Sequence, residues 1–289
     1  MQAGGGERAY IPLNSAKGAT LVSPEIIGPL FDGNDKVAIA IARIRQFTPP
    51  EGLYVAFSGG KDSVVLLDLV RKAGVKHDVH YNLTTVDPPE LVHFIRKEYP
   101  DVQVHRPAMT MWQLIVKKNM PPTRMMRFCC EYLKEGRGTG NRESGRIIAT
   151  GIRWAESVRR GKRRMVENCK NHPDKNFLHP IIDWTTDDVW NYIRTNNLPV
   201  CSLYAEGWKR IGCVMCPMAG PTGMARDMER WPKIAAAYKY KRAIGRCVEE
   251  RKQRGIADVS REWGTEDDMW DWWLRGGSKE EDPNPWLFE

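Results

Sequence analysis

Apolar residues recur along the first part of the chain in two spacings that alternate with each other. Residues 36–47 carry apolar side chains three and four positions apart and end before a Thr-Pro-Pro sequence, as an amphipathic helix does. A continuous apolar run follows at residues 53–57, and residues 64–70 return to the helical spacing. The pattern predicts a helix, a buried strand and a second helix, in that order.

The alternation continues further along the chain. Strands are predicted at residues 75–83, 102–106 and 146–152, with helices at residues 88–99 and 111–118 between them. Strands that alternate with helices favour an α/β fold, with a mostly parallel sheet and helices on both faces. In such a sheet we expect a phosphate-bearing ligand at the carboxyl ends of the strands.

Two later segments extend this prediction. The polar residues 167–176 are interpreted as a surface loop. Residues 179–184 are mostly apolar and predict a short strand, which leads into a helix that Thr185 or Thr186 caps.

Composition divides the chain into three parts. Residues 1–30 predict a flexible leader, and residues 31–222 carry the strand and helix pattern of the main domain. Residues 223–289 are rich in helix formers and predict a helical, Trp-rich C-terminal extension. Four of its tryptophans are candidates for a docking surface: Trp263, Trp270, Trp272 and Trp273.

The overall composition is that of a globular protein. Hydrophobic residues make up 42% and charged residues 28% of the 289 positions. No uninterrupted apolar run approaches the ~20 residues that span a bilayer, and the first residues lack the apolar core of a signal peptide. We therefore expect a cytoplasmic protein with no membrane contact.

The charge of the chain favours polyanionic partners. The formal net charge is +8 and the pI is about 9.1, which suits nucleic acids, nucleotides or sulfate esters. The densest basic block is Arg159-Arg160-Gly161-Lys162-Arg163-Arg164. It is either a solvated face or a site for a second phosphate or a nucleic-acid backbone.

A glycine pair marks the turn between the predicted strand at 53–57 and the helix that follows. In Ser58-Gly59-Gly60-Lys61-Asp62-Ser63 the glycines let the backbone approach an anion, and the first N–H groups of the helix point toward it. Lys61 adds a cation, and the two serines add hydroxyls for phosphate or magnesium. The spacing is neither that of the common nucleotide-binding loop nor that of the dinucleotide fingerprint. The segment resembles the pyrophosphatase loop of the adenine nucleotide alpha-hydrolase superfamily; the alternative is an ordinary Gly-Gly turn with a solvated lysine.

Four of the seven cysteines occur as two close pairs. Cys129 and Cys130 are adjacent, and Cys213 and Cys216 form a C-x-x-C pair. An odd cysteine count without a secretory signal argues against a disulfide framework. Four thiolates suit tetrahedral zinc or an iron–sulfur cluster, and adjacent cysteines favour the cluster because their side chains diverge. Alternatively, Cys129 and Cys130 are small buried residues, and the C-x-x-C is a pair at the start of a helix.

Several ordered blocks resemble the phosphoadenylylsulfate/adenylylsulfate reductase family. The resemblance covers about residues 50–220 and implies a Rossmann-like adenine nucleotide alpha-hydrolase fold with the nucleotide on the Ser58 to Ser63 loop. It also implies a four-iron cluster on the two cysteine pairs. The blocks are the Ser58 to Ser63 loop, Thr85 to Glu90, Cys129-Cys130, Gly151-Ile152-Arg153 with Glu156 to Arg159, His179 to Trp184, and Glu206 to Cys216.

One departure from that family changes the expected reaction. The reductases carry a nucleophilic cysteine in a Glu-Cys-Gly-Leu-His motif, which is absent from this sequence. Cys247 follows Cys216 in a helical setting and is interpreted as a buried or incidental thiol. An intact loop and cluster cysteines without that motif are similar to the DNA phosphorothioation ATP pyrophosphatases of the same family.

This second resemblance implies an enzyme of sulfur transfer. ATP with Mg²⁺ would adenylate an acceptor, probably a nucleic-acid phosphate, and a cysteine desulfurase type of protein would supply sulfur. The implied catalytic residues are Lys61, Asp62 and Arg153, and a homo-oligomer is compatible with the resemblance. The implied nucleotide-binding residues are Ser58, Gly59, Gly60, Lys61, Asp62, Ser63, Gly151, Arg153, Arg159 and Arg160.

Two other functions stay open at this stage. One is an adenylylsulfate or phosphoadenylylsulfate reductase that uses a thiol not yet identified. The other is a non-catalytic protein that binds nucleotide or nucleic acid and carries a structural metal, against which the intact Lys61, Asp62 and Ser63 argue. Pyrophosphate release from ATP separates the sulfur-transfer enzyme from the reductase, because a reductase receives its nucleotide already activated.

Overall fold

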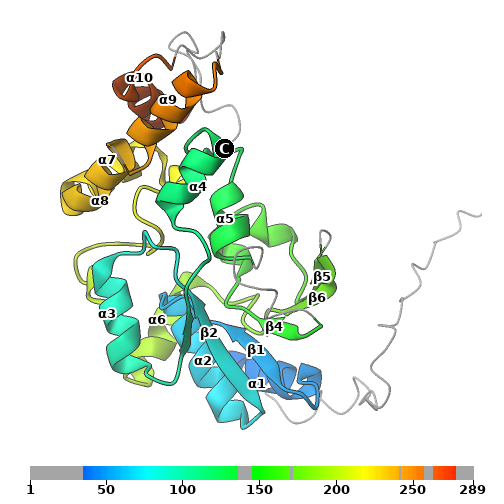
Figure 1. Ribbon diagram of the computed structural model, residues 1–289. Helices are drawn as coiled ribbons and strands as arrows, with labels where there is room; N and C mark the ends of the chain where they lie inside the picture. The colour runs from blue at the N-terminus through cyan, green and yellow to red at the C-terminus, as the bar shows by residue number, and fades with distance from the viewer. Residues whose placement is uncertain (1–34, 136–144, 170–171, 241, 257–262, 278–289) are drawn as a thin grey trace, which may run out of the picture.

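One mixed sheet organises the protein (Figure 1). Its strand order is β3-β2-β1-β4-β6-β5, and every neighbouring pair is parallel except β5 and β6. The strands are β1 (Leu53–Ala56), β2 (His77–Asn82), β3 (Gln103–His105), β4 (Ile147–Ala149), β5 (Val166–Cys169) and β6 (His172–Leu178). The computed structural model describes residues 35–135, 145–169, 172–240, 242–256 and 263–277, so the leader expected at residues 1–30 lies outside it.

The helices alternate with the strands as the apolar spacing predicts, which confirms the α/β fold class. Two of them, α1 and α6, pack against α2, the helix that follows β1. Side-chain caps set where some of them begin: Asp35 caps α1, and Thr185 caps α6 in a capping box with Asp188. The helices of this part are α1 (Lys36–Phe47), α2 (Lys61–Ala73), α3 (Pro89–Glu98), α4 (Met111–Lys118), α5 (Phe128–Leu133) and α6 (Thr186–Thr195).

The interpretation of residues 167–176 as a loop is wrong. Residues 166–169 form β5 and residues 172–178 form β6, which pair antiparallel with each other, while β6 also pairs parallel with β4. Backbone hydrogen bonds form these strands whatever the side chains are. Polar side chains are tolerated in β5 because it is the edge strand of the sheet. The hydrophobic pattern therefore misses this hairpin.

The short strand expected at residues 179–184 is also absent from the structure. The segment follows β6 as a series of turns, with Ile182 donating to the His179 carbonyl at 3.2 Å and Trp184 donating to that of Ile181 at 3.1 Å. Ile181, Ile182 and Trp184 are nevertheless fully buried. Burial of a turn produces the same apolar run as a strand, which explains the error.

The described residues of the C-terminal part form four helices, which gather beside α4 and away from α1 and α2 (Figure 1). They are α7 (Gly220–Arg230), α8 (Pro232–Lys239), α9 (Ile244–Gln253) and α10 (Glu266–Leu274). The predicted boundary between residues 222 and 223 falls within α7. The division into two domains stays a prediction. Among the described helices, none is both long enough and apolar enough to cross a bilayer.

The tryptophans of this extension are core residues, so their expectation as a docking surface is wrong. Trp263, Trp270, Trp272 and Trp273 are each at most 9% exposed. The Trp273 indole donates to the Pro122 carbonyl at 2.6 Å. Large aromatic side chains gain most from burial, and here the extension covers the segment after α4 with them.

Candidate active site

The predicted phosphate loop lies at the carboxyl end of β1 and opens directly into α2. Gly59 has a φ of +69°, and a Cβ there would lie 2.7 Å from the Leu91 side chain and 2.8 Å from that of Ile95. Only glycine fits this position. Gly60 is the N-cap of α2, so the loop ends where the first helical N–H groups are free of helical partners.

The two loop serines have different roles. The Ser63 hydroxyl donates to the Gly60 carbonyl at 2.8 Å and accepts from the Ser58 backbone N–H at 3.2 Å. Its oxygen also lies 3.2 Å from the Ser58 hydroxyl. Ser63 is buried and holds the loop closed, whereas Ser58 is exposed; both serines line the cavity above the loop.

Asp62 pairs with two cations, one from Lys61 and one from Arg153. Lys61 Nζ donates to one Asp62 oxygen at 2.9 Å, and Arg153 Nε donates to the other at 2.8 Å. Arg153 is 1% exposed and also donates to the Trp184 carbonyl at 3.1 Å. Lys61 and Asp62 line the cavity, but Arg153 reaches it only through Asp62. The structure thus gives Arg153 a positioning role, and its direct contact with ligand oxygens stays a prediction.

The other predicted binding residues lie at different depths. Gly151 lines the cavity, and a Cβ there would lie 2.7 Å from the Asp62 carbonyl oxygen, so glycine lets the two segments touch. Arg160 also lines the cavity and pairs with Glu156. Arg159 is exposed outside the lining.

Tyr204 is a site residue that the sequence analysis missed. Its hydroxyl accepts a hydrogen bond from the Lys61 backbone N–H at 2.9 Å, and its ring packs edge-on against Trp190. Burial raises the pKa of Tyr204 to about 12, so the hydroxyl keeps its proton. With one lone pair occupied by Lys61, the O–H is free to donate to an anion in the cavity. No local signal identifies Tyr204, because it is remote from the loop in the sequence.

His179 is a buried histidine behind the cavity to which the sequence analysis gave no role. His179 is 0% exposed; its Nδ1 lies 2.7 Å from the Thr150 hydroxyl and its Nε2 lies 3.4 Å from a Glu167 carboxylate oxygen. Burial lowers the pKa of His179 to about 4, so the imidazole is neutral at pH 7. If Nε2 carries the proton for Glu167, Thr150 donates to Nδ1 and presents only lone pairs to the cavity that it lines.

The cysteine pairs reach the same cavity from different segments. Cys129 and Cys130 lie on α5, whereas Cys213 and Cys216 lie on the loop before α7. Three of the four, Cys130, Cys213 and Cys216, line a cavity of about 500 Å³ that the phosphate loop also lines. The fold therefore brings together the two motifs that the sequence places far apart.

Contacts from the C-terminal part hold the C-x-x-C loop. Val214 donates to the Val86 carbonyl at 2.8 Å, and Met215 donates to the Asp227 carboxylate on α7 at 2.7 Å. The Tyr238 hydroxyl on α8 donates to the Val214 carbonyl at 3.2 Å. Burial raises the pKa of Asp227 to about 6. Two helices of the extension thus fix the backbone between the two cysteines.

The arrangement of the four thiols limits the kind of metal group that they could hold. Among the described residues, no three His, Cys, Asp or Glu side chains converge closely enough to hold one ion. The pKa of Cys130 is lowered to about 6, mainly because Cys129 donates a hydrogen bond to it. The same hydrogen bond raises the pKa of Cys129. Cys213 and Cys216 add to the electrostatic effect on Cys129, so the four sulfurs interact. Thiols spread around a cavity fit a cluster with several irons better than a single zinc ion.

The remaining described thiols have the character of core residues. Cys201 is 1% exposed and Cys247 is 0% exposed. Burial raises the pKa of both, to about 11 for Cys247. A thiol that is buried and protonated is a poor nucleophile, which agrees with the interpretation of Cys247 as a buried thiol.

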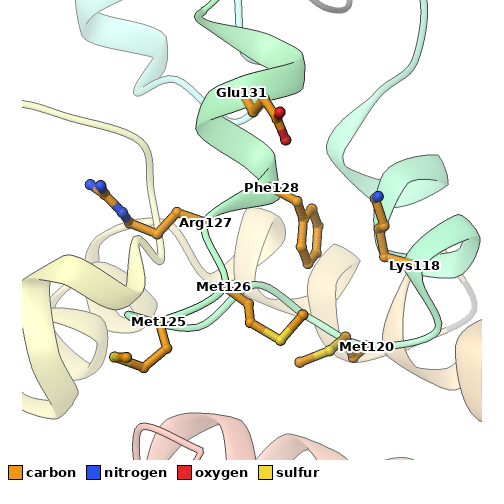
Figure 2. A pocket seen from close by; sticks show the side chains of 7 residues that line it. All are labelled: Lys118, Met120, Met125, Met126, Arg127, Phe128 and Glu131. Atoms are coloured by element: carbon orange, nitrogen blue, oxygen red, sulfur yellow. The ribbon is translucent and has the colours of Figure 1, made fainter. Parts of the chain in front are cut away.

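A second, smaller hollow of about 330 Å³ lies beside α5. Figure 2 shows Met120, Met126 and Phe128 around it, with Arg127 extending to one side. Arg127 lines both this hollow and the larger cavity. Met125 is 90% exposed and Met126 is 51% exposed, so an adaptable apolar surface lies next to the helix that carries the cysteine pair.

Comparison with known proteins agrees with the predicted family. The family model for the phosphoadenosine phosphosulfate reductase domain matches residues 52–219 of the sequence. An adenosine 5'-phosphosulfate reductase of Oceanobacillus iheyensis is 29% identical over 167 residues, which are 56% of this chain and 69% of that protein. An uncharacterized protein of Methanocaldococcus jannaschii is 30% identical over 232 residues, which are 75% of this chain and about half (48%) of that protein.

Solved structures with a similar fold were also found. The phosphoadenylyl-sulfate reductase of Candida auris is 21% identical with a TM-score of 0.48, over 60% of this chain and 87% of that chain. The U34-tRNA thiolase of Methanococcus maripaludis, solved with its [4Fe-4S] cluster, is 13% identical with a TM-score of 0.42, over 78% of this chain and 82% of that chain. These likenesses concern the fold alone.

Proposed function

Since this chain belongs to the phosphoadenosine phosphosulfate reductase domain family, we propose that it is an ATP pyrophosphatase of sulfur transfer. It adenylates an acceptor, for which a nucleic-acid phosphate is the best candidate, and prepares it for sulfur insertion. The observation that carries the proposal is the single cavity lined by both the phosphate loop and three cysteines. A group that activates a phosphate and a group that handles sulfur belong together only where one reaction needs both.

The phosphate loop is suited to bind the β and γ phosphates of ATP with Mg²⁺. Lys61 is the cation that lines the cavity at the start of α2, and its present partner is Asp62. When a phosphate enters, Lys61 turns to it, and Arg153 continues to neutralise Asp62. The Lys61 ammonium and the helix N-terminus then offset the charge that builds on the leaving pyrophosphate.

The first step is an attack on the α phosphorus of ATP. An acceptor phosphate oxygen forms the new P–O bond, the bond between the α phosphorus and its bridging oxygen breaks, and pyrophosphate leaves. The acceptor oxygen becomes part of an AMP leaving group. Sulfide then attacks the acceptor phosphorus: a P–S bond forms, the P–O bond to AMP breaks, and AMP leaves. A donor of the cysteine desulfurase type carries its sulfur as a persulfide, so two electrons from a cellular dithiol reductant release that sulfide before the attack.

The residues that would hold an iron–sulfur cluster are Cys129, Cys130, Cys213 and Cys216. A cluster bound there supplies a site for binding sulfide or for moving electrons. The protein's own contribution is to fix the two pairs of thiols: α5 presents one pair, while Asp227 and Tyr238 hold the loop that presents the other. We further propose that a sulfur-donor protein of the cysteine desulfurase type docks at the exposed Met125 and Met126, beside α5.

The same thiols support a cytoplasmic location as part of this proposal. All six cysteines for which the structure describes a side chain are free. Four of them serve the proposed site only while they stay reduced, as they do in the cytoplasm. We therefore place the protein there.

A reductase is the second candidate, and the reductase relatives at 26–29% identity favour it. Its nucleophile would have to be a reactive thiol outside the cluster set. Cys201 and Cys247 are buried with raised pKa values and do not qualify. Among the thiols that the structure describes, none outside the cluster set is suited to be the nucleophile of a reductase. This favours the pyrophosphatase.

The deciding experiment measures pyrophosphate and AMP released from ATP by protein purified without oxygen. Iron and acid-labile sulfide are counted in the same sample, with and without nucleic acid. Release of pyrophosphate that nucleic acid stimulates supports the pyrophosphatase. Absence of ATP turnover together with tight binding of adenylylsulfate would replace it with the reductase.

A further inference from the structure

Trp154 differs from every other tryptophan in the described part of the chain. It is 44% exposed, and no aromatic ring of the described residues packs against it. Each of the others packs its ring against another aromatic ring: Trp112, Trp184, Trp190, Trp208, Trp231, Trp263, Trp270, Trp272 and Trp273. An exposed indole without a partner leaves a large apolar surface in water, which is costly unless a ligand covers it.

The indole is nevertheless held in place. Its Nε1–H donates to the Arg163 carbonyl at 2.8 Å, and the Trp154 backbone N–H donates to the Ile182 carbonyl at 2.7 Å. These two bonds fix the ring at one edge and leave other parts of it exposed. A ring fixed in this way loses little conformational entropy when a flat ligand stacks on it.

Uncompensated positive charge lies next to this ring. Arg159, Lys162 and Arg164 are exposed, and no carboxylate of the described residues pairs with them. Their neighbours Arg160 and Arg163 are paired, with Glu156 and Glu167 respectively. The basic block is thus divided into structural arginines and three side chains that remain available to anions. These three side chains fit either reading of the block, a solvated face or an anion site.

The surface formed by Trp154, Arg159, Lys162 and Arg164 leads into the active-site cavity. Trp154 and Glu156 share one short 3-10 turn, Trp154–Glu156, and Arg160 begins the next, Arg160–Lys162, which packs against it. Glu156 and Arg160 line the cavity. A polymer bound across Trp154 therefore lies at the cavity mouth with its backbone near the three cations.

We propose that this surface binds single-stranded nucleic acid, with one unpaired base stacked on Trp154 and the neighbouring phosphates on Arg159, Lys162 and Arg164. The inference deepens the proposed function, on which it rests, by stating that the acceptor is a single strand or a locally unpaired segment. In a duplex the base faces are already stacked on each other and are not offered to an indole. The combination of one aromatic platform with adjacent cations is what sequence-tolerant binding of single strands uses.

The test is fluorescence anisotropy with the full-length protein and labelled oligonucleotides of one mixed sequence. The probes are single-stranded DNA, single-stranded RNA and the DNA duplex, each titrated at several salt concentrations. Wild type should bind the single strands more tightly than the duplex. Trp154→Ala should weaken single-strand binding roughly tenfold, while Trp154→Phe retains most of it. Comparison of DNA with RNA identifies the sugar that the site accepts.

The basic residues are tested separately. Arg159→Ala with Lys162→Ala should lower the slope of log affinity against log salt by about 0.7 for each side chain removed. Lys252→Ala, an exposed cation on α9, is the matched control and should change neither quantity. The thermal midpoint of each variant confirms that it is folded.

The outcomes separate this inference from the function beneath it. If Trp154→Ala binds single strands as well as wild type, or if wild type binds duplex equally well, the inference is overturned and the pyrophosphatase stands. If wild type binds no nucleic acid at all while releasing pyrophosphate from ATP, both the inference and the nucleic-acid acceptor are wrong, and only ATP activation survives.

Discussion

The two sides of the cavity are built in different ways. The phosphate side is local: Ser58 to Ser63 close their own loop, and Gly59 alone permits its turn. The cysteine side is assembled from α5 and a distant loop, which Asp227 and Tyr238 hold from the C-terminal helices. The hydrogen bonds that close the phosphate loop join residues within this short segment, so they depend less on remote packing than the cysteine side does.

This contrast leads to separable defects. A change on the phosphate side should stop ATP chemistry and leave the thiols in place. A change on the cysteine side, or in the helices behind it, should release the metal group and leave nucleotide binding intact. The four predictions below test whether the two sides fail independently, beginning with the largest expected effect.

Lys61→Ala should lower ATP turnover by about a hundredfold or more, because it removes the cation that offsets charge on the pyrophosphate. Pyrophosphate release measures the loss, and the iron content should equal that of wild type. Lys72→Ala, at the other end of α2, is the matched control and should retain turnover. Unchanged turnover in Lys61→Ala would remove the lysine from the mechanism.

Cys213→Ser should remove most of the bound iron, because a hydroxyl is a poor replacement for a thiolate ligand. Iron analysis and the visible absorption spectrum measure the loss, and binding of a non-hydrolysable ATP analogue should persist. Cys247→Ala is the control, since that thiol is buried in α9, and its iron should stay. Full iron content in Cys213→Ser would contradict the four-cysteine site.

His179→Gln should flatten the loss of stability in acid. The pKa of His179 is lowered from 6.5 to about 4, so the unfolded chain takes up this proton first as the pH falls. The stability from the neutral imidazole is complete above pH 6.5 and falls by about 3 kcal/mol as the pH drops to about 4. Denaturant unfolding at pH 7 and pH 4.5 measures the difference in wild type and variant.

Wild type and His179→Gln are compared at both pH values, so every other titrating group is common to the two proteins. If His179→Gln loses as much stability in acid as wild type does, the buried histidine is not the group responsible.

Asp227→Ala should lower stability by about 1–3 kcal/mol, because it leaves the Met215 N–H buried without a partner. Some iron should be lost with it, while the affinity for the ATP analogue stays the same. Glu229→Ala, which changes an exposed carboxylate on the same helix, is the control. Weaker binding of ATP together with full iron content would show that the two sides are not independent.

Much of the main domain was predictable from the chain alone. The bounds of α1 and α4 agree with the apolar spacing, and Thr185 begins α6 as expected. The glycine pair located the phosphate loop. These features depend on interactions within a few residues, namely helix periodicity, side-chain caps and the backbone freedom of glycine.

The errors share one cause. The hairpin of β5 and β6 exists because β6 pairs with β4, and the apolar turn at residues 179–184 is apolar because it is buried. The tryptophans of the extension were expected at a surface because their number suggested a binding patch. In each case the side chains are compatible with two environments, and packing selects one of them.

The sequence by itself determined the fold class, the phosphate loop and the grouping of the cysteines, because each depends on residues that are close together in the sequence. Only the tertiary structure decided that Arg153 is buried against Asp62, that the Tyr204 hydroxyl accepts from the Lys61 N–H, and that Trp154 is left exposed. The physical reason is distance along the chain. Contacts between remote segments form only where packing brings them together, and no local pattern records them.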